Sequence, residues 1–188
     1  MSRPLRQEAP GGLFHVYARG NNGRAIYLDD HDRQTYFDLL HKTVVFRGWH
    51  CLSYCLMDNH MHLLLETPRP NLASGMQQLH GQYARKYNDR YSSTGHLFDG
   101  RYGAVLIKSD HQLLAVLRYI AVNPVKAGLC RRPEGYRWSS HGPTVGDSAP
   151  EFLNLDRLFW HLGGLDTDPR TLYMNLVETA PRNVTFPS

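Results

Sequence analysis

Residues 58–66 read DNHMHLLLE and combine a turn signal with an alternating strand pattern. The Asp58-Asn59 pair favours a tight turn, because both side chains can hydrogen-bond the neighbouring backbone. Successive side chains of a strand point to opposite faces, so His60 and His62 share one face. The opposite face is apolar and consists of Met61, Leu63 and Leu65. A second strand pattern precedes the turn, and the two segments are therefore expected to form a β-hairpin.

The flanking sequence predicts the element order β-α-β-β-α-β-α. Strands are expected over residues 13–19, 49–56, 60–66 and 96–107, the last broken near Gly100 and Gly103. Helices are expected over residues 31–47, 72–90 and 109–122. Asp30, Asn71 and Ser109 are the expected N-caps of these helices, and Pro124 is expected to end the third. Two β-α-β halves joined by a hairpin indicate an α+β protein of the ferredoxin-like (RRM-like) class, with helices packed on an antiparallel sheet.

The composition of the chain changes near residue 142. Residues 1–141 contain the predicted sheet and are expected to form one domain, whereas residues 142–188 are rich in Gly, Pro and Asp. One short helix, over residues 155–162, is predicted in this C-terminal tail. The tail is net acidic, which argues against a role as a DNA clamp.

Length and composition exclude several classes of protein. The 188 residues are 41% hydrophobic and 20% charged, which suits a packed core and excludes wholesale disorder. No apolar run approaches the roughly 20 residues that a transmembrane helix needs. The first residues lack the apolar segment of a secretion signal, so a cytoplasmic location without membrane attachment is expected.

The spacing of Cys51 and Cys55 raises the question of a zinc site. Both fall in the alternating apolar strand before the turn, and Cys130 is the one other cysteine. Buried, reduced strand cysteines are therefore the preferred interpretation.

Positive charge is concentrated in the middle of the chain. Residues 81–140 hold ten basic and four acidic residues, a net charge of +6, whereas the whole chain carries +4. Aromatic residues alternate with these cations, a pattern typical of surfaces where cations bind phosphates and rings stack on unpaired bases. The rings expected to stack are Phe98, Tyr102 and Trp138. An ordinary solvated surface is the alternative interpretation.

His60 and His62 are candidate metal ligands. Two imidazoles on one strand face can bind the same divalent cation. The alternative is a pair of partly exposed strand histidines that bind nothing. A third ligand would have to come from another element, and for Mg²⁺ or Mn²⁺ it would be an oxygen. Glu66 lies on the same strand face. It could be a partner that supports the histidine ligands or a charge at the strand end, and the second interpretation is preferred.

The helix predicted over residues 109–122 presents two further candidates at its C-terminal end. Tyr119 and Asn123 are four residues apart, a spacing that places them on one helical face. Each has a simpler interpretation: Tyr119 as a half-buried aromatic residue, and Asn123 as the N-cap of a segment that starts at Pro124. The residues alone leave these alternatives open.

Several motifs in order resemble the single-tyrosine HUH transposases, and specifically the REP-associated tyrosine transposases. NHMHLL at residues 59–64 resembles the histidine-hydrophobic-histidine motif of that family. GHLFDGRY at residues 95–102 and RYIAVNPVKAGL at residues 118–129 resemble two further signatures. HVYARGNN at residues 15–22 and YRWSS at residues 136–140 also fit, so the resemblance spans about residues 12–141.

The resemblance implies a metal-dependent enzyme that nicks and rejoins single-stranded DNA. Tyr119 would be the nucleophile and become joined to a DNA 5′ end, while His60, His62 and Asn123 would bind Mg²⁺ or Mn²⁺. The substrate would be hairpin-forming palindromic repeat DNA with a short guide sequence, and a monomer is favoured over a homodimer. The residues expected to contact DNA are Arg85, Lys86, Arg90, Arg101, Tyr102, Lys108, Arg118 and Lys126.

Two other functions compete with this one. A protein that binds nucleic-acid hairpins without catalysing a reaction would carry the same basic segment, but it would not need Tyr119, His60 and His62 together. A ferredoxin-like metal protein with a small substrate would leave the charge of residues 81–140 unexplained.

Overall fold

The computed structural model describes residues 10–163 and 168–179 and is built around a four-stranded sheet. Its strands are β1 (Gly12–Arg19), β2 (His50–Leu56), β3 (His60–Thr67) and β4 (Gly103–Leu106), in the spatial order β2-β3-β1-β4. Each strand pairs antiparallel with its neighbours. This is the strand order of the ferredoxin-like α+β class, so the predicted fold is confirmed.

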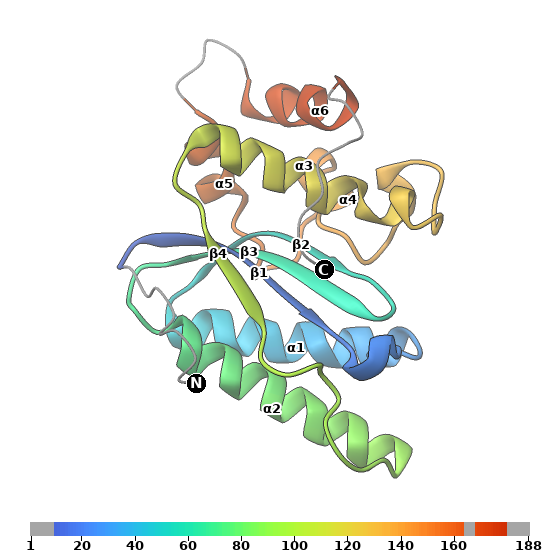
Figure 1. The fold of residues 1–188 in the computed structure, drawn as a ribbon. Helices are drawn as coiled ribbons and strands as arrows, with labels where there is room; N and C mark the ends of the chain where they lie inside the picture. Colours follow the sequence, from blue (N-terminus) through green and yellow to red (C-terminus); the bar gives the residue numbers. More distant parts are fainter. Residues whose placement is uncertain (1–9, 164–167, 180–188) are drawn as a thin grey trace.

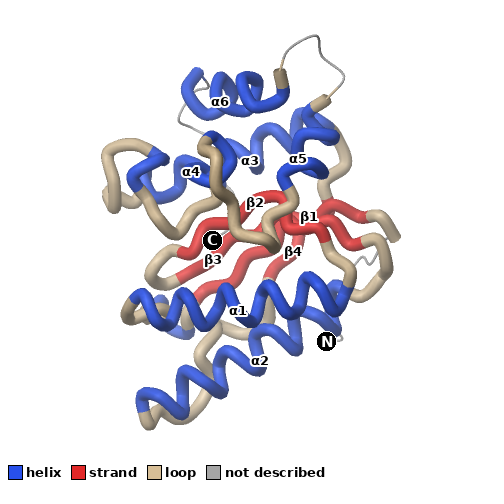
Figure 2. The backbone as a smooth tube through the Cα atoms, turned by 180° about the vertical axis from the view of Figure 1, so that it is seen from behind, coloured by secondary structure: helices blue, strands red, loops and turns tan. Residues whose placement is uncertain are grey.

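Helices cover both faces of the sheet (Figure 1). On one face lie α1 (Asp30–Arg47) and α2 (Leu72–Tyr91), and on the other lies α3 (Asp110–Lys126). The view from behind shows the same layers, with α6 (Pro169–Thr179) on the outer side of α3 (Figure 2). Among the helices of the described residues, none has the length and hydropathy needed to cross a membrane.

The alternation of β3 separates two hydrophobic clusters. Met61, Leu63 and Leu65 join the cluster beneath α1 and α2, as the sequence predicted. Leu64, from the opposite face, joins the cluster beneath α3. Cys51 and Cys55 on β2 are buried free thiols, as expected. The histidine face of β3 therefore points toward α3.

Two expected helix caps are wrong in detail. Asp29, rather than Asp30, caps α1, because its carboxylate accepts a hydrogen bond from the Asp32 N–H at 3.0 Å. Asn71 precedes α2, but its side chain makes no capping hydrogen bond. Its amide oxygen instead accepts a hydrogen bond from the Trp49 indole at 2.6 Å, which ties the start of α2 to the segment before β2.

The third helix continues through Pro124, contrary to the expected stop at residue 122. A proline inside a helix removes one backbone hydrogen bond and costs about 3 kcal/mol. Ile120, Ala121 and Pro124 are nevertheless buried, and their packing offsets that cost. The predicted start is confirmed, since the Ser109 hydroxyl accepts a hydrogen bond from the Gln112 N–H at 3.3 Å. Asn123 consequently lies inside α3 rather than at the start of a new segment.

The C-terminal tail holds more structure than expected. The predicted helix is present as α5 (Leu155–Leu162), whereas α4 (His141–Val145) and α6 were not predicted. Residues of α5 and α6 pack with α3 in one hydrophobic cluster; they are Leu158, Leu162, Tyr173 and Val177. The start of α6 could have been predicted from the sequence, because Asp168 followed by Pro169 is a typical helix N-cap and first position. In the structure, Asp168 accepts a hydrogen bond from the Thr171 N–H at 2.8 Å.

Glu66 is a buried partner of the tail, and its interpretation as a strand-end charge is wrong. Its carboxylate accepts two hydrogen bonds of 2.7 Å from Arg157 and lies 3.0 Å from His161 Nε2. Burial raises the pKa of Glu66, but the hydrogen bonds from Arg157 and His161 outweigh it and hold the pKa below its usual value. The pairing links the end of β3 to α5.

Replacement of Glu66 by glutamine is expected to lower the free energy of unfolding by about 2 kcal/mol, because Arg157 loses its charged partner. Urea unfolding at pH 7 measures the change. The difference from the parent should shrink as the pH falls through the lowered pKa of Glu66, where the carboxylate of the folded parent protonates. Glu151→Gln is the matched control, because the Glu151 side chain is 86% exposed. Equal stability of the two variants would contradict this role for Glu66.

Candidate active site

The two predicted metal ligands lie side by side beneath α3. The ring centroids of His60 and His62 are 5.1 Å apart, with an interplanar angle of 78°. His62 is fully buried (0% exposed), whereas His60 is partly exposed. The strand alternation that predicted a shared face therefore brings both imidazoles to the α3 side of the sheet.

Tyr119 projects from α3 onto this histidine pair. Its ring meets the ring of His62 edge to face, with centroids 5.1 Å apart. Only 8% of Tyr119 is exposed, and burial raises the pKa of its phenol, while a hydrogen bond with Asn123 acts in the opposite direction. The Lys126 ammonium lies 5.7 Å from the centroid of the Tyr119 ring.

Asn123 links the tyrosine to the histidines. It lies one helical turn after Tyr119, is 7% exposed, and hydrogen-bonds both Tyr119 and His60. This position depends on the continuation of α3 through Pro124. The structure thus brings together all four residues that the sequence singled out for chemistry.

His15 is a fifth member of the site that the sequence analysis did not single out. It lies on β1, is 0% exposed, and its Nε2 is 3.1 Å from His62 Nδ1. The period-two pattern of β1 held the signal: Phe14 and Val16 face the core beneath α1 and α2, so His15 and Tyr17 must face α3. Tyr17 pairs directly with His62 in the β1–β3 register.

Burial favours the neutral form of the imidazoles of this site. Burial lowers the pKa of His15 to about 4, and it lowers those of His60 and His62 as well. A neutral imidazole can donate from one nitrogen and offer a lone pair at the other. With His62 Nδ1–H donating to His15, His62 Nε2 keeps its lone pair, and this buried atom has no hydrogen-bond partner among the described residues.

These donors fit a small divalent cation. His60 and His62 offer imidazole nitrogens, and Asn123 beside His60 offers an amide oxygen, a mixed set that Mn²⁺ or Mg²⁺ accepts. Within residues 10–163 and 168–179, no group of three His, Cys, Asp or Glu side chains could hold a metal.

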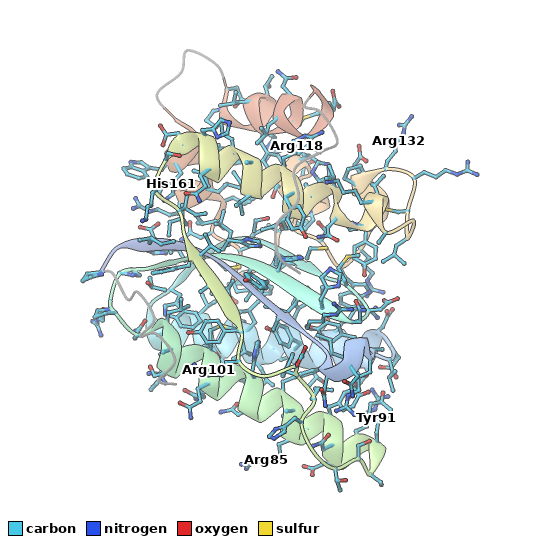
Figure 3. The ribbon with its side chains drawn as sticks, viewed as in Figure 1. Arg85, Tyr91, Arg101, Arg118, Arg132 and His161 are labelled. Carbon is cyan, nitrogen blue, oxygen red and sulfur yellow. The ribbon has the colours of Figure 1, made fainter. Side chains whose placement is uncertain are left out.

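The basic residues expected to contact DNA are divided between the two sides of the sheet. Arg118 lies on the α3 side, whereas Arg85 and Arg101 lie on the side of α1 and α2 (Figure 3). Lys86 shares α2 with Arg85. The sheet therefore separates Arg85, Lys86 and Arg101 from Tyr119.

Arg90 is engaged within the protein. Its guanidinium forms ion pairs of 2.6 Å with both Asp29 and Asp32. Among the expected DNA contacts, Arg118 and Lys126 lie within α3, the helix that carries Tyr119, and Lys108 lies just before it.

The expectation that three aromatic rings stack on unpaired bases is wrong for this structure. Phe98, Tyr102 and Trp138 are buried in the cluster beneath α1 and α2. Phe98 stacks instead on the buried His80 ring, with centroids 4.2 Å apart. The aromatic half of the interleaved pattern therefore builds the core rather than a DNA surface.

Known proteins resemble this chain in sequence and in fold. The family described as "Transposase IS200 like" matches residues 13–123, from β1 to Asn123. A Haemophilus influenzae protein named "Putative REP-associated tyrosine transposase" is 26% identical over 164 residues, which cover 80% of this chain and 92% of that protein. The solved structure of a REP-associated tyrosine transposase bound to a REP hairpin matches with a TM-score of 0.67. That match covers 82% of this chain and 98% of the other at 18% identity, and supports the fold. Together these findings confirm the family resemblance of the motifs.

Proposed function

Since this chain is a member of the IS200-like transposase family, we propose that it nicks and rejoins single-stranded DNA through a covalent bond to Tyr119. The observation that carries the proposal is the position of Asn123, which hydrogen-bonds both Tyr119 and His60. A candidate nucleophile and a pair of metal-binding imidazoles thereby share one site. On this proposal the protein is a site-specific single-strand endonuclease of the HUH type.

In the proposed reaction, the phenolic oxygen of Tyr119 attacks the scissile phosphorus. The Oη–P bond forms, the P–O3′ bond breaks, the phenol loses its proton and the 3′ oxygen gains one. The products are a 5′-phosphotyrosine and a free 3′ hydroxyl, and a 3′ hydroxyl can later reverse the step without ATP. Burial alone makes the phenol a poor nucleophile, so the hydrogen bond from Asn123, which acts to lower its pKa, assists the attack.

His60, His62 and Asn123 would hold the divalent ion, Mg²⁺ or Mn²⁺. When bound, such an ion polarises the scissile phosphate and offsets the negative charge on its oxygens. Metal binding needs deprotonated imidazoles. Burial lowers the pKa of both histidines, so they are ready to ligate at neutral pH.

The proposed substrate is hairpin-forming repeat DNA with a single-stranded flank. The solved relative binds a REP hairpin, and in this chain Lys108, Arg118 and Lys126 lie on or beside the helix that carries Tyr119. We propose that these three cations bind the phosphates of the single-stranded flank. The proposed active form is a cytoplasmic monomer, with a homodimer as the alternative.

The burial of Tyr119 favours a second candidate, a hairpin-binding protein without catalytic activity. A pure binder would nevertheless have no use for His62, whose Nε2 is buried without a hydrogen-bond partner in the described part of the chain. Such a group costs stability unless a ligand compensates it. The nuclease is therefore preferred.

A comparison of substrate forms tests the proposal. With Mn²⁺ at one salt concentration, a hairpin with a single-stranded flank should be cut within the flank, whereas the fully paired duplex of the same sequence should bind without being cut. Binding of both should weaken steeply with salt, because bound phosphates release counterions. Equal cleavage of the duplex would point to an ordinary metal nuclease, and binding without any cleavage would favour the second candidate.

His15 is expected to position His62 for metal binding. Replacing His15 by methionine removes the acceptor for His62 Nδ1–H while keeping a buried side chain of similar bulk. Mn²⁺ affinity, measured by calorimetry, should fall about 10- to 100-fold. His15→Gln should restore most of it, because its amide oxygen reaches to about the position of the imidazole Nε2. Unchanged Mn²⁺ affinity in His15→Met would contradict this role.

A further inference from the structure

Asn59 lies in the turn between β2 and β3, directly before His60, and the proposed reaction gives it no role. Its side-chain oxygen lies 2.7 Å from Nδ1 of His60. Its side-chain nitrogen donates a hydrogen bond of 3.1 Å to the backbone carbonyl of Gly23. The amide therefore bridges a proposed metal ligand and a second turn, the 3₁₀ turn η1 (Asn21–Gly23), which follows β1.

The hydrogen bond to Gly23 determines which way the Asn59 amide faces. A backbone carbonyl only accepts hydrogen bonds, so the NH₂ group of Asn59 must face Gly23 and the oxygen must face His60. The amide oxygen is also only an acceptor, so Nδ1 of His60 must carry the proton. In a neutral imidazole with its proton on Nδ1, the lone pair is on Nε2. Nε2 is therefore the nitrogen of His60 that can bind a metal.

The backbone around η1 holds the Gly23 carbonyl in place. The Gly20 N–H donates to the Asn59 carbonyl at 2.8 Å, and the Gly23 N–H donates to the Gly20 carbonyl at 2.9 Å. A Cβ atom at Gly20 would collide with the Arg24 carbonyl oxygen, and Gly23 has a φ of +71°, which favours glycine. Residues 20–22 end the motif that begins at residue 15. This part of the motif thus supports the side chain of Asn59.

The β2–β3 turn is also anchored at Asp58. Its carbonyl accepts hydrogen bonds from the N–H groups of Ile26 and Tyr27, at 2.8 and 3.2 Å. Its carboxylate forms an ion pair with Arg33 of α1. Because the turn is fixed from both sides, Asn59 can hold the His60 ring in place.

We propose that Asn59 is a positioning residue for the metal site, which fixes the tautomer and orientation of His60 so that Nε2 faces the bound cation. The inference rests on the proposed function, which makes His60 a metal ligand. Asn59 would act on His60 as His15 is expected to act on His62. A role in the structure of the turn alone is the alternative that the experiment must separate.

NMR of the metal-free protein with isotope-labelled histidines tests the tautomer directly. At a pH where the imidazole is neutral, the parent should carry the His60 proton on Nδ1. Asn59→Leu keeps most of the side-chain bulk but offers no acceptor, so it should show a mixture of the two tautomers. Asn59→Asp keeps an oxygen beside Nδ1 and should restore the parent tautomer. If Asn59→Leu does not fold, Asn59→Ala takes its place.

Metal binding is the second readout. The Mn²⁺ affinity, measured by calorimetry, should fall about 10- to 100-fold in Asn59→Leu and return to within a few-fold of the parent value in Asn59→Asp. Gln82→Leu is the control, because it removes an exposed amide from α2, on the opposite side of the sheet. Its Mn²⁺ affinity should equal that of the parent. Thermal unfolding of each variant confirms that the fold is retained.

A proton on Nε2 of His60 in the parent would overturn the inference, as would an Mn²⁺ affinity that Asn59→Leu leaves unchanged. Loss of Mn²⁺ affinity in Asn59→Leu with the parent tautomer retained would assign Asn59 a role in the turn alone. If the parent binds no Mn²⁺, the metal of the proposed function is refuted, and this inference with it. If the parent binds Mn²⁺ as tightly as Asn59→Leu does, only this inference is refuted.

Discussion

Replacement of Tyr119 by phenylalanine is expected to abolish strand cleavage and leave DNA binding intact. The substitution removes the single oxygen that attacks the phosphorus, while the ring keeps its edge-to-face contact with His62. Loss of a nucleophile lowers the rate by about 10⁴-fold or more. Cleavage of a labelled hairpin substrate and its affinity should therefore be measured on the same preparation.

Tyr17→Phe is the matched control for this experiment. Tyr17 is a second tyrosine, among the described residues, whose ring lies near His62, at a centroid distance of 6.4 Å. Its variant should cleave within a few-fold of the parent rate. If Tyr119→Phe retains cleavage activity and Tyr17→Phe loses it, the nucleophile is Tyr17 and the assignment to Tyr119 is wrong.

Removal of the metal ligands is expected to have an effect nearly as large. His60→Ala should lower the cleavage rate by about 10³-fold, because the charge on the phosphate oxygens would no longer be offset. Substitution of His60 is easier to interpret than substitution of His62, because His60 is only partly buried and its removal leaves no internal cavity that would destabilise the fold. EDTA should abolish cleavage by the parent protein, and added Mn²⁺ should restore that cleavage.

The control for His60→Ala is His31→Ala, at the exposed start of α1. That variant should cleave at the parent rate and lose activity in EDTA as the parent does. Full cleavage by His60→Ala, or by the parent in EDTA, would remove the metal from the proposed mechanism.

The local pattern of β3 was sufficient to predict both the hairpin and the shared face of His60 and His62, because strand alternation is a property of the backbone. The status of Asn123 was not predictable in this way. The residues around it allowed either a cap before Pro124 or a place inside α3, and buried contacts made far along the chain decided between them. Tertiary packing of this kind overrides a local stop signal.

Other differences have the same origin. The local sequence around Glu66 indicates a strand-end charge. Its actual partner, Arg157, is far along the sequence and hydrogen-bonds Glu66 only in the folded protein. The alternating cations and aromatic rings of residues 81–140 predicted one DNA-binding surface, but Tyr102 and Trp138 belong to the core. Charge and aromaticity indicate what a residue can bind, whereas burial, which sequence spacing alone does not fix, decides whether it is available.

The proposed reaction leaves Tyr119 covalently joined to a DNA 5′ end. The most direct measurement is to incubate the parent with Mn²⁺ and a hairpin substrate labelled at its 3′ end, digest the trapped complex with protease, and identify the modified peptide by mass spectrometry. We expect a 5′-phosphonucleotide on Tyr119, within the α3 peptide, and a free 3′ hydroxyl on the other DNA fragment. An adduct on a different residue, or cleaved DNA with a free 5′ phosphate and no adduct, would contradict it.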